Sequence, residues 1–197
     1  GRYAGWLALY SGIAGGGDII LLPEIPYDID AVTEQIKLRN SMGKNFSIVV
    51  VGEGACPLGG EMVVQRTVKN SPEAIRLGGV SHQVARQIEG LTNIECRVTI
   101  LGHLLRGGQP TANDRLLATQ VGVEAVRLVA REEYGRLVVL HNNAISSVSI
   151  ESIAGKQRRV TPEHPMVSTA LALGICLGFP EDVSLDRYLG QLEMSHT

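Results

Sequence analysis

Two short, almost wholly apolar runs set the strongest limit on the fold of this chain. They cover residues 18–22 and residues 46–51, and each is bounded on both sides by glycine or proline within a few residues. Runs of this length with no polar face are typical of parallel strands that are buried on both sides. A segment with helical apolar spacing precedes each run, which favours helices alternating with strands.

The rest of the chain continues this alternation. Helical patterns cover residues 6–14, 28–42, 81–91, 112–133 and 166–177, and further strand patterns cover residues 95–101, 137–140 and 146–150. Asp30 is the expected cap of the second helix and Gly43 its end, whereas Thr111 and Asp114 resemble a capping box. Residues 57–71 are polar and glycine-bearing, which indicates a surface excursion. The sequence therefore predicts an α/β, Rossmann-like fold with a mainly parallel sheet and helices on both faces.

Composition excludes several classes of function. The net charge is −2, the basic residues are scattered and only 4% of residues are aromatic, which argues against a nucleic-acid partner. No apolar run reaches the length of about 20 residues that a membrane helix needs, and no signal-peptide pattern opens the chain. We therefore expect no membrane partner. The three cysteines are widely spaced and far from any histidine cluster, so we expect reduced thiols in a cytoplasmic protein.

The most distinctive stretch is the decapeptide of residues 101–110. It follows the strand pattern of residues 95–101 and carries His103 and Arg106 between glycines. Glycine allows the backbone to approach a ligand closely, and ligands of open α/β sheets bind beyond the carboxyl ends of strands. A cationic loop at that place is a candidate site for an anion such as a sugar phosphate. A glycine-rich turn whose histidine and arginine face water explains the spacing equally well.

Four ordered motifs together resemble the phosphofructokinase family. They are Gly1-Arg2-x-x-Gly5, then Ala14-Gly15-Gly16 with Pro23-Glu24-Ile25-Pro26, then Glu53-Gly54-Ala55, and finally Gly102-His103-x-x-Arg106-Gly107-Gly108-x-Pro110 with Asp114-Arg115 and Ala118-Thr119. They run through about three quarters of the chain, to residue 155. The family's glycine-rich nucleotide loop and its catalytic aspartate are not among these residues. The chain therefore resembles the carboxyl-terminal half of a phosphofructokinase.

The resemblance implies roles for individual residues in phosphorylating fructose 6-phosphate to fructose 1,6-bisphosphate. His103 and Arg106 would bind the 6-phosphate, and Glu53 would accept hydrogen bonds from the sugar hydroxyls. Gly1 would offer its backbone to the sugar, and Arg2 would face the phosphates near the transferred group. No catalytic residue is assigned, because the base belongs to the other half.

Three further positions bear on assembly and regulation. Arg97 occupies the family position that reaches a neighbouring subunit's 6-phosphate, which implies a homo-oligomer, a dimer or a tetramer. The resemblance places Glu24 where bacterial allosteric members bind an effector's metal ion. Because Lys44 is followed by uncharged residues, we interpret Glu24 as structural or vestigial. Leu105 departs from the family pattern, which usually has glutamine there.

The resemblance also implies a division of the chain and a set of cofactors. Residues 1–103 would belong to the substrate lobe, residues 104–155 would pack on an amino-terminal lobe, and residues 156–197 would return to the substrate lobe. The phosphoryl donor would be ATP, slightly favoured, or pyrophosphate, with Mg²⁺ bound mainly through the donor. We expect this piece alone to be inactive.

Two other functions are open to such a chain. One is a non-catalytic phosphosugar-binding or regulatory half of a duplicated phosphofructokinase. The other, a simple dinucleotide-binding domain, is disfavoured because no G-x-G-x-x-G motif follows a predicted strand.

Overall fold

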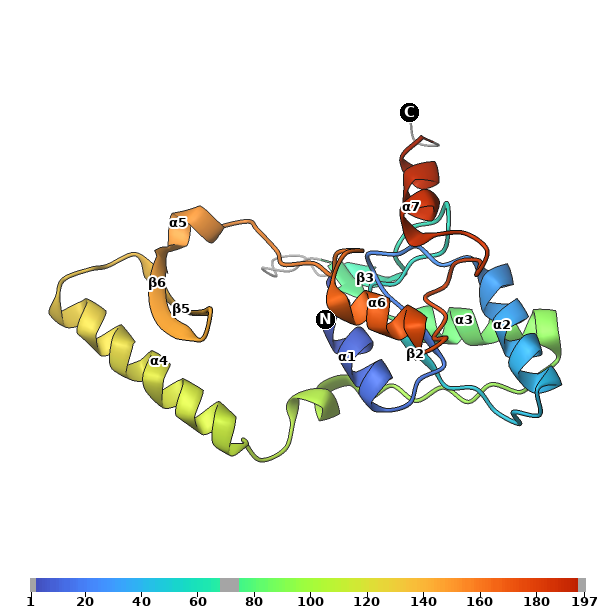
Figure 1. The fold of residues 1–197 in the computed structure, drawn as a ribbon, viewed down its shortest axis with the longest axis horizontal. Helices are drawn as coiled ribbons and strands as arrows, with labels where there is room; N and C mark the ends of the chain where they lie inside the picture. Colours follow the sequence, from blue (N-terminus) through green and yellow to red (C-terminus); the bar gives the residue numbers. More distant parts are fainter. Residues whose placement is uncertain (1–2, 68–74, 195–197) are drawn as a thin grey trace. The chain divides into compact units, whose positions relative to one another are not determined.

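The chain forms two compact units in a computed structural model that describes residues 3–67 and 75–194. The first unit contains Gly1–Ile100 and Arg158–Thr197, and the second contains Leu101–Gln157 (Figure 1). Gly1 and Arg2, which were assigned to the substrate site, lie outside the described residues.

The first unit is built around β1 (Ile19–Leu21), whose three residues are completely buried. β1 pairs in parallel with β2 (Val49–Val51), with Ile19 opposite Val49. On its other edge Ile19 forms a parallel bridge with Cys176, where the Ile20 amide donates to the Cys176 carbonyl at 2.8 Å. β1 is therefore a central strand with parallel neighbours on both sides.

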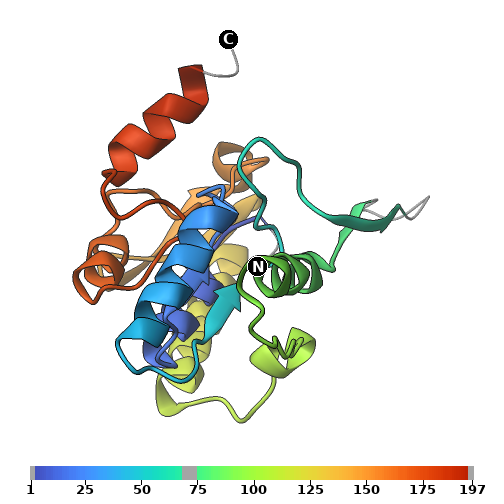
Figure 2. The ribbon, with the colours of Figure 1, turned by 90° about the vertical axis from the view of Figure 1, so that its right-hand side faces the viewer.

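Helices cover both faces of this small sheet. Successive side chains of a strand point to opposite faces, and the core divides accordingly. Ile20 and Leu22 pack in a cluster with residues of α1 (Trp6–Ala14) and α6 (Pro165–Ala172). Ile19 and Leu21 pack in a second cluster with residues of α2 (Ile29–Ser41) and α3 (Val80–Thr92), which lie side by side (Figure 2). The expected α/β architecture is confirmed.

Local signals placed most helix boundaries correctly. α1 covers the expected residues, and α2 ends just before Gly43, whose φ is +81°. The cap of α2 was predicted wrongly. Asp28, not Asp30, has the extended backbone of an N-cap, and its side chain accepts a hydrogen bond from the Asp30 amide at 2.9 Å.

Two elements predicted beside the first unit's sheet are also wrong. Residues 95–101 form no strand, because within the described residues no neighbouring strand pairs with them, and the Cys96 amide instead donates to the Glu89 side chain at 2.8 Å. The tail helix predicted over residues 166–177 ends at Ala172. Gly174 has a φ of +73°, which breaks the helix, and Cys176 then joins the sheet beside β1.

Three elements of the first unit were not predicted. β3 (Val64–Thr67) and β4 (Ile75–Leu77) form an antiparallel pair, and α7 (Leu185–Met194) follows the last described loop. β3 falls within the surface excursion expected over residues 57–71, of which residues 68–71 lie outside the described part.

The second unit consists of a long helix and a hairpin. The short 3₁₀ helix η1 (Gly102–Arg106) leads to α4 (Ala112–Ala130), which begins with the expected capping box of Thr111 and Asp114. β5 (Arg136–His141) and β6 (Ala144–Ser149) pair antiparallel, and Asn142 and Asn143 take up positive φ values of 48° and 61° in the turn. α5 (Ile150–Ile153) completes the unit.

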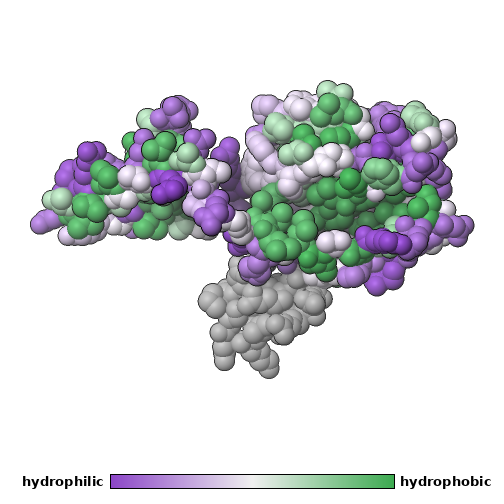
Figure 3. All heavy atoms as spheres, turned by 90° about the horizontal axis from the view of Figure 1, so that it is seen from below, coloured by the Kyte–Doolittle hydropathy of each residue, from purple (hydrophilic) through white to green (hydrophobic). Residues whose placement is uncertain are grey.

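Apolar side chains remain at the surface of both units (green in Figure 3). In α4 only Leu128 is buried, whereas Val126 is 69% exposed. Among the described helices none combines the length and the apolar character that crossing a membrane requires.

The packing of α1 gives a direct stability test. Leu9 is fully buried against β1, whereas Leu7 on the same helix is 40% exposed. We expect Leu9→Ala to lower the free energy of unfolding by about 2–5 kcal/mol, because it leaves a cavity. Leu7→Ala should cost about 1 kcal/mol or less. Urea unfolding followed by the fluorescence of Trp6, the single tryptophan, measures both, and equal losses would contradict this packing.

Candidate functional site

Glu53 lies at the carboxyl end of β2, in a turn that the backbone fixes. The Gly52 amide donates to the Leu21 carbonyl at 2.8 Å and so continues the ladder between β1 and β2 by one bond. The Ala55 amide then donates to the Gly52 carbonyl at 2.9 Å and closes the turn. Gly52, Gly54 and Ala55 are buried, whereas Glu53 is exposed. Its carboxylate has no hydrogen bond to another described residue, and its exposure makes it accessible to a polar ligand.

Glu24 lies at the carboxyl end of β1, and its carboxylate binds backbone amides. Its two oxygens accept from the Gly5 amide at 2.9 and 3.0 Å, and Oε1 also accepts from the Val160 amide at 2.9 Å. These bonds join the loop after β1, the start of α1 and the segment that follows the second unit in the chain. The geometry is that of a structural carboxylate rather than one open to a metal ion.

Hydrogen bonds around Tyr27 join the loops at the same end of the sheet. Its amide donates to the Cys56 carbonyl at 2.9 Å, and the Asp28 amide donates to the Gly178 carbonyl at 2.7 Å. The Tyr188 hydroxyl donates to the Pro26 carbonyl at 3.0 Å. Burial, with the neighbouring charges of Asp28 and Cys56, raises the pKa of Tyr188 to about 12. Burial also raises the pKa of Tyr27, with a further contribution from Cys56.

His103 and Arg106 lie together on η1 in the second unit. Residues three apart on a 3₁₀ helix are eclipsed, so the two side chains project from one face. Gly102, the first residue of η1, and Gly108, two residues after its end, have φ values of +52° and +97°, which explains the need for glycine at both. Both side chains are exposed, and neither pairs with another described residue. The predicted loop at a strand exit is thus a 3₁₀ turn, and the segment before it forms no strand with the part of the chain that the structure describes.

Arg97 lies in that extended segment of the first unit. Its Nε is 3.2 Å from an oxygen of Glu95, and the two side chains are 87% and 75% exposed. Exposed ion pairs of this kind contribute about 0–1 kcal/mol, so a stronger anionic partner can displace Glu95.

The predicted site residues therefore fall into two groups. Glu24, Glu53 and Arg97 belong to the first unit, and His103 and Arg106 belong to the second. The structure brings His103 and Arg106 together on one turn. Their meeting with Glu53 around a single ligand stays a prediction.

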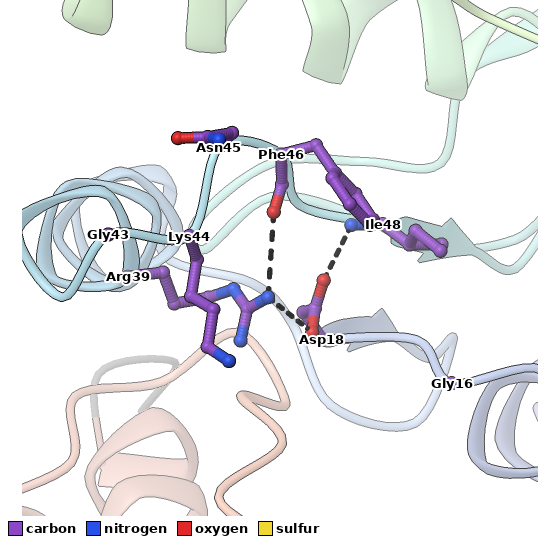
Figure 4. A pocket seen from close by; sticks show the side chains of 8 residues that line it. All are labelled: Gly16, Asp18, Arg39, Gly43, Lys44, Asn45, Phe46 and Ile48. Atoms are coloured by element: carbon purple, nitrogen blue, oxygen red, sulfur yellow. Dashed lines mark hydrogen bonds and ion pairs between the residues drawn. The ribbon is translucent and has the colours of Figure 1, made fainter.

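A second polar cluster was missed by sequence reasoning. It surrounds a cavity of ≈ 460 Å³ at the amino ends of β1 and β2 (Figure 4). Arg39 lies 2.7 Å from Asp18 Oδ1, and Asp18 Oδ2 accepts from the Ile48 amide at 2.8 Å. Arg39 also donates to Ser47 Oγ at 3.1 Å. No local spacing links these residues, so only the fold brings them together.

The described residues contain no group of three or more His, Cys, Asp or Glu side chains arranged to hold a metal ion.

Comparison with known proteins identifies the family. A model described as phosphofructokinase matches residues 1–129. The chain is 49% identical over 176 residues to "ATP-dependent 6-phosphofructokinase 2" of Clostridium perfringens, covering 89% of this chain and 48% of that protein. It is 44% identical over 178 residues to "ATP-dependent 6-phosphofructokinase" of Spirochaeta thermophila, covering 90% of this chain and 49% of that protein.

Solved structures agree with this likeness. A pyrophosphate-dependent phosphofructokinase from Marinobacter aquaeolei superposes with a TM-score of 0.64 at 20% identity, over 98% of this chain and 45% of that one. Phosphofructokinase from Saccharomyces cerevisiae gives a TM-score of 0.60 at 27% identity, over 98% of this chain and 24% of that one. The chain belongs to the phosphofructokinase family. It spans about half the length of the curated relatives that it matches.

The burial of the Tyr188 hydroxyl can be tested by the pH dependence of the free energy of unfolding. An unfolded tyrosine loses its proton at a pKa of about 10, whereas Tyr188 in the folded chain does so at about 12. Between these values the unfolded state binds fewer protons, so the free energy of unfolding should fall as pH rises from about 10 to about 12. Urea unfolding across this range should show a shallower fall for Tyr188→Phe. An identical pH dependence in both proteins would contradict the burial of this hydroxyl.

Proposed function

We propose that this chain supplies the sugar-phosphate subsite of a 6-phosphofructokinase, which phosphorylates fructose 6-phosphate to fructose 1,6-bisphosphate in glycolysis. The observation that carries the proposal is the placement of His103 and Arg106 on one exposed face of η1. Two exposed N–H donor side chains three residues apart suit a phosphate group. Family membership supplies the identity of the phosphate-bearing molecule.

His103 and Arg106 would hold the 6-phosphate by different means. A planar guanidinium offers two parallel N–H donors to phosphate oxygens, and an imidazole adds another donor from the same face. The positive φ values of Gly102 and Gly108 fix the direction in which the chain enters and leaves η1. These contacts would anchor the sugar by the end remote from the reacting hydroxyl.

Glu53 would orient the sugar ring. Its carboxylate, held in a turn whose other residues are buried, can accept hydrogen bonds from hydroxyl groups without moving. Gly1 would contribute its backbone to the sugar, and Arg2 would face the phosphates near the transferred group. Phosphoryl transfer depends mainly on such positioning and on neutralising charge.

The donor and the metal ion belong to the same proposal. We favour ATP as the phosphoryl donor, because the two relatives at 49% and 44% identity are both named ATP-dependent. The alternative donor is pyrophosphate, which appears in the name of a solved structure at 20% identity. Magnesium would arrive with the donor phosphates and supply charge neutralisation. We place the enzyme in the cytoplasm.

The second unit offers a physical reason to expect a partner. Residues 104–155 would pack on an amino-terminal lobe and cover the exposed apolar side chains of α4, such as Val126 and Val129, which are 69% and 60% exposed. Residues 1–103 and 156–197 would form the substrate lobe. Arg97 would reach the 6-phosphate of a neighbouring subunit in a homodimer or homotetramer. The isolated piece would bind substrate without catalysing transfer.

Titration with fructose 6-phosphate tests the phosphate contact. We expect Arg106→Ala to weaken binding by about 1.5–3 kcal/mol, or about 10- to 150-fold, as for a lost hydrogen bond to a charged group. Isothermal titration calorimetry of the chain measures the change. Arg127→Ala, on an exposed position of α4, is the matched control and should leave the affinity unchanged. Equal affinities for the Arg106→Ala variant and the parent chain would rule out this assignment.

A further inference from the structure

His164 is the N-cap of α6, and it caps the helix through its imidazole ring. Its backbone is extended, with a φ of −63° and a ψ of 131°, and Pro165 follows at the start of the helix. The ring atom Nδ1 accepts a hydrogen bond from the Met166 amide at 3.2 Å. The side chains preferred at an N-cap accept through an oxygen atom. An imidazole nitrogen, by contrast, accepts only while it carries no proton.

The partly buried His164 ring also packs on the aromatic side chains of α1. Its centroid lies 4.9 Å from that of the Trp6 ring in a T-shaped arrangement, and 6.3 Å from that of the Tyr10 ring. The Trp6 indole N–H in turn donates to the Arg158 carbonyl at 2.8 Å. Arg158 is the residue at which the chain returns to the first unit. A single imidazole therefore connects the start of α6 with α1 and, through Trp6, with this point of return.

Few charged groups surround this ring, and most of them are basic. α1 carries one titratable side chain, that of Tyr10, and α6 carries none. The segment that leads into His164 carries Arg158, Arg159 and Glu163, all of them exposed. The ion pairs among the described residues all involve arginine side chains, so none of them brings a carboxylate to His164.

Protonation of His164 would replace an attraction by a repulsion at the start of α6. An imidazolium carries an N–H donor on both nitrogens, so it would turn a donor towards the Met166 amide. Its charge would lie at the positive end of the α6 dipole. The face of an aromatic ring can stabilise a cation, but the Arg158 guanidinium already lies over the Trp6 ring, 5.1 Å from its centroid. The cap is therefore present only with the neutral ring.

We propose that His164 is a pH-sensitive switch, whose protonation releases the cap of α6 and loosens the contact of this helix with α1. Histidine side chains commonly change charge between about pH 5 and pH 8. Val167 and Ala170 of α6 pack in the same core cluster as Leu9 and Ile20, so the helix that is released lies against α1 and β1. This switch is independent of the substrate proposed above.

Amide hydrogen exchange of the chain between pH 8 and pH 5.5 measures the opening of α6. Exchange is followed by mass spectrometry and corrected for the intrinsic rate at each pH. We expect the protection of residues 166–172 to fall about 2- to 30-fold on acidification, the fold-change that corresponds to the loss of an N-cap. α2 is the internal reference, because its N-cap is Asp28 and not a histidine, and its protection should not change.

Two variants at position 164 bracket the effect. His164→Asn keeps a good N-cap that does not titrate, so the protection of α6 should stay high at both pH values. His164→Ala has no cap at either pH, so its protection at pH 8 should already be as low as that of the parent chain at pH 5.5. His82→Asn, at an exposed position of α3, is the matched control and should leave the response of α6 intact.

Two results would overturn the switch. An equal fall in the parent chain and in His164→Asn would show that acid acts on another group. Unchanged protection of α6 in the parent chain would show that the cap does not depend on the charge of the ring. Should His164→Ala fail to fold, the comparison between the parent chain and His164→Asn still decides between these outcomes.

Discussion

The first unit depends on one constraint, the burial of β1 on both faces and along both edges. Ile19, Ile20 and Leu21 are each completely buried. Their side chains alternate between two separate clusters, one with α1 and α6 and the other with α2 and α3. A polar substitution in β1 would leave an unpaired group in either cluster, which costs about 1–3 kcal/mol on mutational scales. Because both clusters meet at this strand, its position sets that of the four helices.

The two ends of β1 carry carboxylates, and neighbouring amides, with Arg39 at one end, bind both. Asp18 accepts from the Ile48 amide and pairs with Arg39, whereas Glu24 accepts from the Gly5 and Val160 amides. A charge at the edge of a core is stable only when it is paired or hydrogen-bonded. Glu53 differs from both, because it lies exposed in the next loop and accepts no hydrogen bond from another residue that the structure describes. This contrast separates the carboxylates that hold the fold from the one we propose for the sugar.

Local patterns predicted much of the fold, and contacts between distant residues explain where they failed. The apolar runs predicted β1 and β2, and the capping box predicted the start of α4. Each of these signals is contained within a few consecutive residues. Cys176 was placed in a helix because an apolar run fits a helix or a buried strand equally well. Glu24 bonds to amides 19 and 136 residues away, which no local pattern reveals. For the site, the motifs predict His103, Arg106 and Glu53 as ligand-binding residues, but whether they share a ligand depends on an arrangement that spacing does not encode.

The most direct test of this account is a crystal structure of the chain with fructose 6-phosphate bound. The account predicts that the 6-phosphate lies within hydrogen-bonding distance of both His103 and Arg106. It also predicts that the sugar hydroxyls face the Glu53 carboxylate across the same ligand. A phosphate bound elsewhere, for example beside Lys44 at the amino ends of the strands, or a sugar remote from Glu53, would contradict it.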